Sequence, residues 1–380
     1  MEFVASLSAT VGMELELQLL DAETLDLMNG IVPLLQLFPD RADVKPEMIQ
    51  SCVEITSSVC ENTMQVEQRM RGTLADLLQR CDSLGMKLCG AGTHPFGRRL
   101  ALFTPSPRYL RMKTAYGILG RNQLTFATHV HVGVPSGEVA IFAMRHLAPA
   151  LPLILAAAAN SPCWRGYETG FASYRQCILA AAQSYGLPPY FDDWQSFAHF
   201  LETAIRAEVY SSVKDIHWDL RPRPEFGTLE LRIMDAASSL SATAALGALA
   251  RALVVYLTEH AFEDLSDWPV APLPQWIESV NRYRAAVDGL SARYIVSEEG
   301  HSRAVRDVLA DLVEIVQPTA ERIGESAGLA RLERSLEGGV GYEIQRRVFR
   351  ETQDCRDVTR YLVDALQDDA QEVDDVRLQV

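Results

Sequence analysis

The sequence predicts an α+β fold, because segments with strand and helix periodicity are mixed in its first two thirds and helical patterns alone follow. Apolar and polar residues alternate strictly over residues 11–19, 124–134 and 229–233, which is typical of strands with one buried face. No linker-like composition divides the 380 residues. We therefore expect a single domain over residues 1–380, with a sheet-forming part at about 10–240, a helical part at about 240–365 and an acidic tail to 380.

The alternation also tells which side chains share a face. In residues 11–19 the odd positions are apolar, so Glu14 and Glu16 lie on the opposite face. In residues 124–134 the even positions are mostly apolar, which places His129 and His131 together, and Glu230 shares a face with Arg232 in the third strand. Weaker strand patterns cover residues 51–57 and 87–91, and helices are expected at 66–84, 141–159 and 194–213.

Composition narrows the class of protein. A formal net charge of −15 argues against non-specific binding to nucleic acid or to an anionic membrane, since both need clustered positive charge. Seven cysteines without a CxxC pair favour a reducing, cytoplasmic location, and no signal peptide is visible. The most apolar run, residues 147–159, is too short to span a bilayer and contains two prolines, so we expect a buried helix.

Each charged pair has a plain structural interpretation beside a functional one. Glu14 and Glu16 point the same way and repel each other unless a cation lies between them, which would be a metal site. In the structural interpretation they are exposed to solvent and keep an edge strand soluble. The two histidines are either satisfied core residues or metal ligands. Glu230 and Arg232 alone would be an ion pair of little energetic value. Three strands that present Glu, His and Arg on one face favour the functional interpretation.

Carboxylates with few imidazoles suit Mg²⁺ or Mn²⁺ better than structural zinc, and such ions usually accompany phosphate. The chain has no P-loop motif, so any bound ATP is held by metal and basic side chains. Lys214 and Arg221 lie in a cationic segment before the third strand, which is either a solvated loop or a phosphate site. Arg111 and Arg175 are similarly ambiguous, although arginine forks suit phosphate and carboxylate.

Several motifs together resemble the YbdK-like carboxylate-amine ligases of the type 2 glutamate–cysteine ligase family. They are Gly12-Met13-Glu14-Leu15-Glu16, Cys89-Gly90-Ala91-Gly92-Thr93-His94-Pro95-Phe96, Thr128-His129-Val130-His131-Val132-Gly133, Ala159-Asn160-Ser161-Pro162, Lys214-Asp215-Ile216-His217-Trp218-Asp219-Leu220-Arg221-Pro222 and Gly227-Thr228-Leu229-Glu230-Leu231-Arg232-Ile233-Met234-Asp235. The resemblance covers residues 10–240 and, more loosely, the helical remainder. It implies a curved, mainly antiparallel, glutamine-synthetase-like sheet that forms a funnel, with ATP at one end and amino acids at the other.

The resemblance also implies roles. It makes Glu14, Glu16, Glu47, Glu54, His131 and Glu230 ligands of Mg²⁺, with His131 preferred to His129 as the direct ligand. Arg232 would stabilise the transferring phosphoryl group, and Arg111, Arg175, Lys214 and Arg221 are weaker candidates for phosphate or substrate contacts. The implied reaction makes γ-glutamyl phosphate from ATP and glutamate, after which the amine of cysteine or another substrate displaces phosphate.

Two other functions stay open: a metal-dependent hydrolase that works without ATP, and a non-catalytic nucleotide or metabolite sensor with the same fold. The motifs fix neither the amine acceptor nor the number of metal ions. Related enzymes suggest a homodimer acting on small molecules.

Overall fold

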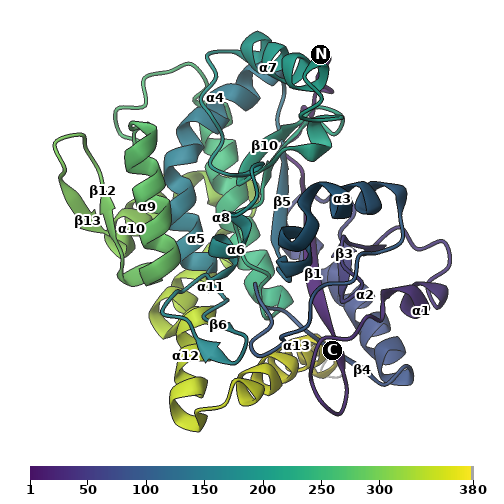
Figure 1. Cartoon of the computed structure of the whole chain (residues 1–380). Helices are drawn as coiled ribbons and strands as arrows, with labels where there is room; N and C mark the ends of the chain where they lie inside the picture. The colour runs from purple at the N-terminus through teal and green to yellow at the C-terminus, as the bar shows by residue number, and fades with distance from the viewer. Residues whose placement is uncertain (378–380) are drawn as a thin grey trace.

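The structure of the protein, a computed structural model, describes residues 1–377 and is built on a seven-stranded antiparallel sheet (Figure 1). The strands run in the order β10-β11-β5-β1-β3-β2, and β4 pairs with the second half of β1. Their bounds are β1 Val11–Asp21, β2 Val44–Pro46, β3 Cys52–Thr56, β4 Met86–Cys89, β5 Thr128–Gly133, β10 Leu220–Arg223 and β11 Thr228–Leu231. The predicted α+β class and antiparallel sheet are therefore confirmed.

Strand β1 lies at the centre of the sheet and sets the register of its neighbours. Glu14 is opposite His129 of β5 on one side, and Glu16 is opposite Glu54 of β3 on the other. One strand further out, Glu230 of β11 is opposite His131. Cross-strand partners lie on the same face of a sheet, so this register gathers charged groups from four strands on one face.

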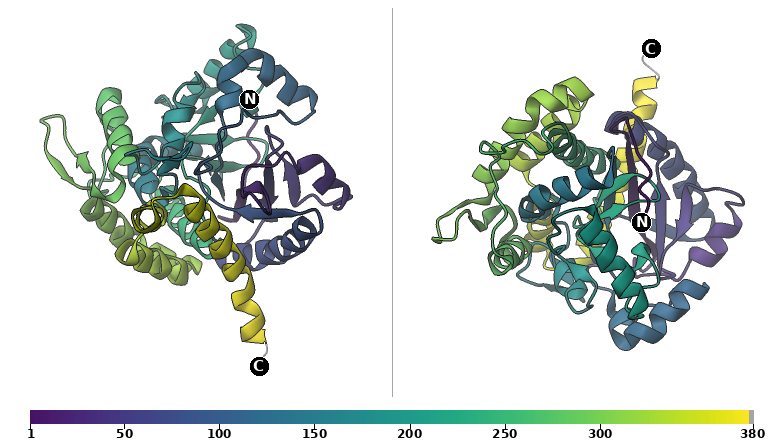
Figure 2. Two further views of the ribbon diagram at one scale, coloured as in Figure 1. Left: turned by 60° about the horizontal axis from the view of Figure 1, so that its bottom comes forward. Right: turned by 90° about the horizontal axis from the view of Figure 1, so that it is seen from above.

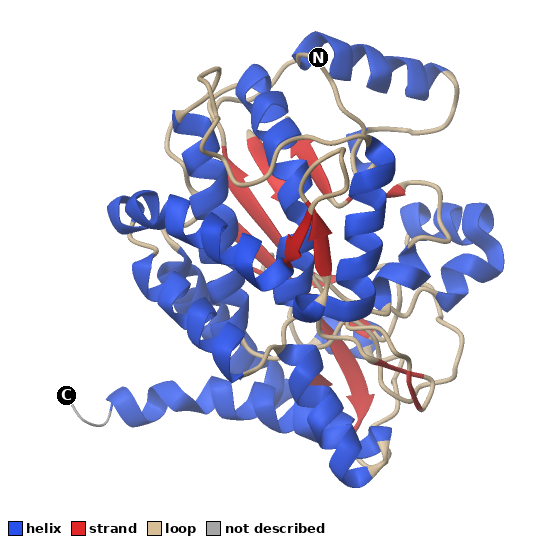
Figure 3. Ribbon diagram, turned by 90° about the vertical axis from the view of Figure 1, so that its left-hand side faces the viewer, coloured by secondary structure: helices blue, strands red, loops and turns tan. Residues whose placement is uncertain are grey.

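The other face of the sheet is apolar and packs on helices. Met13, Leu15 and Leu17 of β1 are almost completely buried. Helices α2 (Thr63–Ser83), α4 (Gly137–Leu147) and α8 (Leu240–Glu259) contact one another or this face. Gly247 of α8 lies against β1 so closely that a Cβ there would sit 2.5 Å from the Met13 sulfur. The strands form a central group with helices around it (Figure 3).

The remaining elements of the first two thirds are short, apart from two helices. Helix α3 (Pro107–Asn122), which the sequence patterns did not predict, lies on the right of Figure 1, as do α1 (Ile31–Gln36) and α2. Helix α7 (Trp194–Arg206) is shorter than expected. The other elements are α5 Leu151–Ala158, α6 Arg175–Leu179, β6 Cys163–Trp164, β7 Tyr167–Glu168, β8 Tyr185–Gly186, β9 His217–Trp218 and the 3₁₀ turns η1 Ala148–Ala150, η2 Val213–Asp215 and η3 Gly289–Ser291.

After α8 the chain is mainly helical, as expected, through α9 (Gln275–Asp288), α10 (Val305–Ile323), α11 (Ser326–Gly338), α12 (Gly341–Thr352) and α13 (Cys355–Arg377). A small hairpin of β12 (Arg293–Ile295) and β13 (Ser302–Ala304) interrupts the helices, which the periodicity did not predict. Hydrophobic residues of both parts of the chain belong to one core cluster. The end of α13 extends past the body of the molecule (Figure 2).

Two helical stretches, Gly137–Ala158 and Leu240–Glu259, are long and apolar enough to cross a membrane by length and composition. In each, 83% of the most apolar window is buried inside the protein, which is the behaviour of core helices. The predicted buried helix at 147–159 is thus part of a longer helical stretch that begins at Gly137.

Candidate active site

The charged face of the sheet lines a cavity of about 400 Å³. Four carboxylates, which we call the carboxylate cluster, face it: Glu14, Glu16, Glu47 and Glu54. Alternation on β1 and β3 brings Glu14, Glu16 and Glu54 to the cavity, as predicted. Glu47 arrives differently, from the residue after β2, where its carboxylate accepts a hydrogen bond from the Met48 amide at 3.1 Å.

The cluster is electrostatically strained in the absence of a cation. Burial and the charge of Glu47 raise the pKa of Glu16 to about 8. Burial together with its acidic neighbours Glu14, Glu47 and Glu16 raises the pKa of Glu54 well above its usual range, and burial and Glu14 also raise the pKa of Glu47. The single basic partner of Glu54 in the described chain is Lys45, whose Nζ lies 3.8 Å from the carboxylate and whose side chain is 45% exposed. These carboxylates therefore lack the positive charge that their ionised forms require.

Both histidines of β5 are buried, and each has an unpartnered Nε2 atom. The Nδ1 atom of His129 lies 2.9 Å from the carboxylate of Glu14, and that of His131 lies 3.2 Å from the hydroxyl of Thr228. Burial works to raise the pKa of Glu14, but the two neighbouring imidazoles, His129 and His131, outweigh burial and lower it well below the usual range. Burial and Arg232 lower the pKa of His129 to about 4, so this imidazole is neutral and able to bind a metal.

Glu230 is fully buried beneath three guanidinium groups. Arg221 donates from Nε at 2.8 Å, Arg223 from Nη1 at 2.9 Å, and Arg232 donates as well. Burial alone would raise the pKa of Glu230, but Arg221 and Arg232 hold it well below its usual range. All three arginines line the cavity, so Glu230 orients a group of positive charges beside the carboxylate cluster.

The other predicted basic residues separate into two groups. Lys214 and Arg221 line the cavity, as a phosphate or substrate contact requires. Arg175 is buried behind it, donates to the carbonyls of Ile233 and Arg232 and lies 3.9 Å from Asp235, so it braces the end of β11. Arg111 lies on α3 and lines a neighbouring cavity, which the carboxylate cluster does not line.

Several cavity residues were not singled out from the sequence, among them Lys45, Arg108, Tyr109, Gln123 and Tyr185, whereas His217 and Arg223 belong to the predicted cationic segment. Gln123 is 2% exposed, and neither its amide nitrogen nor its amide oxygen has a partner among the described residues. A buried amide without partners is costly, so the geometry indicates that a ligand or water satisfies it. Gln123 follows α3, a helix that was not predicted, and no local signal marks it.

The donor set fits hard divalent cations. Ligand atoms of Glu14, His129 and Glu230 lie within 4.8 Å of one another, as do those of Glu16, Glu54 and His129. Carboxylates predominate in both groups, and the orphaned Nε2 of His129 supplies a neutral donor, a combination that suits Mg²⁺ or Mn²⁺. Both groups contain His129, so the geometry favours it over His131, which was preferred from the sequence.

The chain matches a known protein family over most of its length. The family model described as glutamate–cysteine ligase family 2 matches residues 10–363.

The chain belongs to this family.

A relative from Trichormus variabilis named "Putative glutamate–cysteine ligase 2" is 43% identical over 366 residues, covering 96% of this chain and 95% of the relative. A relative with the same name from Thermobifida fusca is 35% identical and covers 95% of this chain and 92% of its own length. Membership of this ligase family confirms the predicted family and the predicted enzyme class.

Solved structures agree at the level of the fold. A glutamate–cysteine ligase from Francisella tularensis in complex with AMP superposes with a TM-score of 0.68 at 10% identity, covering 98% of this chain and 90% of that one. A bifunctional glutathione synthetase from Pasteurella multocida gives a TM-score of 0.63 at 13% identity, covering 96% of this chain and 52% of that chain. At these identities the match shows a shared fold, the one expected from the sequence.

Proposed function

We propose that the protein is an ATP-dependent carboxylate-amine ligase that joins glutamate to an amine through γ-glutamyl phosphate, in the cytoplasm. The observation that carries this proposal is a single cavity lined both by the carboxylate cluster and by Arg221, Arg223 and Arg232. An acyl-phosphate ligase needs this arrangement, because carboxylates hold cations and guanidinium groups neutralise a phosphoryl group in transfer. Family membership and the AMP complex of the Francisella enzyme support the same reaction.

The residues that would hold Mg²⁺ form two groups, Glu14 with His129 and Glu230, and Glu16 with Glu54 and Glu47 beside them. When bound there, Mg²⁺ would neutralise phosphate oxygens and supply the positive charge that the carboxylate cluster lacks. Glu230 would keep Arg232 aimed at the cavity, since the two side chains are directly hydrogen bonded.

The chemistry follows from this arrangement. A γ-carboxylate oxygen of glutamate attacks the γ-phosphorus of ATP, the bond to ADP breaks, and Arg232 stabilises the charge of the group in transfer. The amine nitrogen then bonds to the acyl carbon, the bond to phosphate breaks, and the amine loses a proton. Gln123, with its unpartnered amide, is suited to orient the polar end of glutamate.

The nucleotide base has a suitable place at the Glu14 end of the sheet. A cavity of about 320 Å³ there is lined by Glu14, His131, Val59 and Phe226. Phe226 is 56% exposed, and Arg223 lies over its ring at 4.8 Å. An exposed aromatic ring beside a guanidinium group offers a stacking surface for a base, while the phosphates would reach toward Arg232.

The test is a measurement of ADP release with ATP, Mg²⁺ and glutamate, with and without a panel of amines. We expect amine-dependent ADP release and an amide product detected by mass spectrometry. Turnover of amide or ester substrates without ATP would instead favour a metal-dependent hydrolase. ATP binding measured by calorimetry without ADP formation from any amine would favour a sensor and contradict the ligase proposal.

A further inference from the structure

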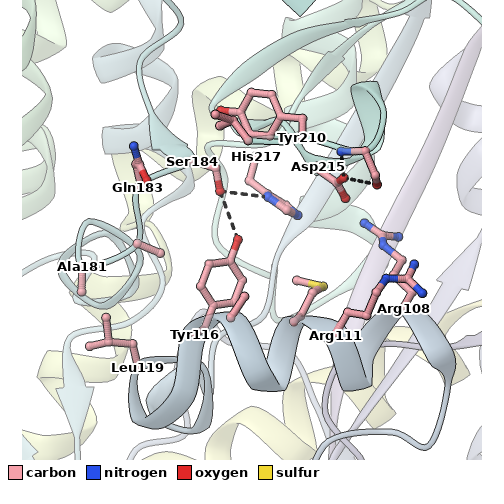
Figure 4. Close-up of a pocket in the computed structure, with 15 residues that line it drawn as sticks. Arg108, Arg111, Tyr116, Leu119, Ala181, Gln183, Ser184, Tyr210, Asp215 and His217 are labelled. Carbon is pink, nitrogen blue, oxygen red and sulfur yellow. Dashed lines mark hydrogen bonds between the residues drawn. The ribbon is translucent and has the colours of Figure 1, made fainter. Parts of the chain in front are cut away.

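A second cavity, of about 490 Å³, opens beside the candidate active site, and the reaction described so far does not use it. It lies between α3 and the segments 181–184 and 209–217 (Figure 4). Arg108, Met112 and His217 line both cavities, so the two spaces adjoin. A substrate bound in the second cavity can therefore present a reactive group to the first.

The end of this second cavity nearest the active site is charged. Arg108 and Arg111 lie at the start of α3, and Asp215 faces them from η2 (Figure 4). In the part of the chain that the structure describes, neither guanidinium group is in an ion pair. Asp215 accepts hydrogen bonds from Ser211 at 2.8 and 2.5 Å, and these bonds outweigh its burial and lower its pKa. Two unpaired guanidinium groups suit a carboxylate, and an ionised aspartate suits an ammonium group.

The far end of the second cavity is apolar. Leu119, Ala115, Ala182 and Tyr210 line it, and Leu119 is 44% exposed although it faces a concave surface. An exposed apolar surface rimmed by polar groups is a common mark of a ligand site.

Three polar side chains of this cavity, Tyr116, Ser184 and His217, bond to one another, while Gln183 lies beside Ala181 (Figure 4). The Tyr116 hydroxyl lies 3.3 Å from the Ser184 hydroxyl, which lies 3.2 Å from Nδ1 of His217 (Figure 4). Burial together with Arg232 and Arg221 lowers the pKa of His217 to about 3, so it is neutral here. With these three groups already paired, the far end offers a ligand apolar contact and the amide of Gln183.

We propose that this second cavity binds the amine substrate, and that this substrate is an α-amino acid with an aromatic or long aliphatic side chain rather than cysteine. The proposal rests on the proposed ligase function. The carboxylate would pair with Arg108 and Arg111, the amine would face the active site, and the side chain would fill the space beside Leu119. A cavity of this size falls in the range that encloses drug-sized ligands, and the short side chain of cysteine would leave its apolar end empty.

The first experiment compares amines. Purified full-length protein is assayed with ATP, Mg²⁺ and glutamate plus cysteine, alanine, leucine, phenylalanine or tyrosine, and each kcat/KM is measured. We expect leucine or an aromatic amino acid to exceed cysteine by about tenfold or more, since each buried methylene contributes on this scale. A preference for cysteine or alanine would overturn the inference and leave the ligase function intact. Absence of ADP release with every amine would instead remove the ligase function itself.

The second experiment tests the location of the substrate. Ala115→Phe fills the apolar end from α3, and we expect kcat/KM for the preferred large amino acid to fall at least tenfold relative to cysteine. Ile118→Phe is the matched control, because Ile118 lies on the same helix, is 57% exposed and does not line the second cavity. If both variants kept the selectivity of the parent, or if the control alone lost it, the amine would bind elsewhere.

Discussion

At the scale of single residues, the carboxylate cluster lowers the stability of the fold in order to provide a cation site. Glu54 is 4% exposed and faces three other carboxylates, and only Lys45 offers it a positive charge in the described chain. A buried charge without compensation is destabilising, so the site is costly to the fold when no cation is bound. A cation that binds relieves this repulsion, and the carboxylates need no rearrangement to bind it, so the destabilisation favours cation binding.

Glu54→Gln should therefore stabilise the protein without divalent cations and abolish its turnover. In EDTA we expect the free energy of unfolding to rise by about 1–3 kcal/mol, because glutamine keeps the shape and the folded protein no longer has to protonate or bury that carboxylate. Added Mg²⁺ should raise the Tm of the parent more than that of the variant. Thermal unfolding with and without Mg²⁺ measures both effects. Glu298→Gln, at an exposed position, is the control, and equal Mg²⁺ responses of all three proteins would refute the metal assignment.

Arg232→Lys tests the cationic side chains of the cavity. Lysine retains the charge but not the planar fork, so it cannot hold Glu230 and a phosphoryl group together. We expect kcat for ADP release to fall by about 100-fold or more, on the scale of losing one transition-state donor. Circular dichroism should show a folded variant, and Arg303→Lys, an exposed partner of Asp311, should keep parental activity. A variant with near-parental kcat would remove Arg232 from the reaction.

Glu230 shows what side-chain type alone does not reveal. If Glu230 were only a metal ligand, as the family resemblance implies, Glu230→Gln would remove a ligand charge and leave the fold unchanged. The structure shows that the same change would leave three buried guanidinium groups short of a partner, so it would destabilise the fold as well. Glu14, which is half-buried, is the sharper test of metal binding.

At the scale of elements, alternation predicted the strands with one apolar face and missed those without it. The predicted strands at 51–57 and 124–134 contain β3 and β5, and the one at 11–19 covers β1 except for its last two residues. Strand β10 reads Leu-Arg-Pro-Arg, and its arginines are buried only because β11 supplies Glu230 opposite them. Helix α3 has a single buried residue, Gly120, so it carries no apolar stripe by which to recognise it. The pairing of β10 with β11 and the packing of α3 depend on residues outside each element, so local periodicity does not predict them.

The loop after β4 is held by His94, which is fully buried. Its Nε2 lies 2.9 Å from the Leu25 carbonyl, and its Nδ1 accepts from the Gly97 amide at 2.7 Å. This pattern requires the neutral imidazole with its proton on Nε2, and burial accordingly lowers the pKa of His94 to about 4. Protonation of Nδ1 would break the contact with Gly97.

The lowered pKa of His94 predicts that the protein loses stability in acid. The unfolded chain binds the proton near pH 6.5 and the folded one near pH 4, so stability is fully present above 6.5 and falls as pH drops through this window. Between pH 7 and pH 5 the parent should lose about 2 kcal/mol more than His94→Gln in urea unfolding. His199→Gln, at an exposed site on α7, should follow the parent. Equal losses in the parent and His94→Gln would show that His94 titrates normally.

At the scale of the whole molecule, the C-terminal helix α13 is hydrogen bonded to α8 and α2, the helices that pack on the apolar face of the sheet. The acidic composition of residues 368–375 suggested solvated surface, but Asp369 is 7% exposed and accepts from the amides of Leu240 and Ser241 at 2.9 and 3.2 Å. It therefore caps the start of α8, and Arg71 of α2 bonds to it as well. A local charge pattern cannot distinguish this buried cap from its exposed neighbours, because the cap exists only once α13 has packed.

Asp369→Ala should consequently destabilise the entire fold, although it lies far along the chain from the sheet. The change removes two helix-capping hydrogen bonds and leaves Arg71 with one partner fewer, so we expect the free energy of unfolding to fall by about 1–3 kcal/mol. Asp368→Ala, at the exposed neighbouring position, should change it by less than about 0.5 kcal/mol. Urea unfolding of both variants measures the difference. Since α8 packs against β1, a parallel rise in the Mg²⁺ concentration needed for turnover would show that the cap also supports the carboxylate cluster, whereas equal stability of the two variants would show that α13 packs without it.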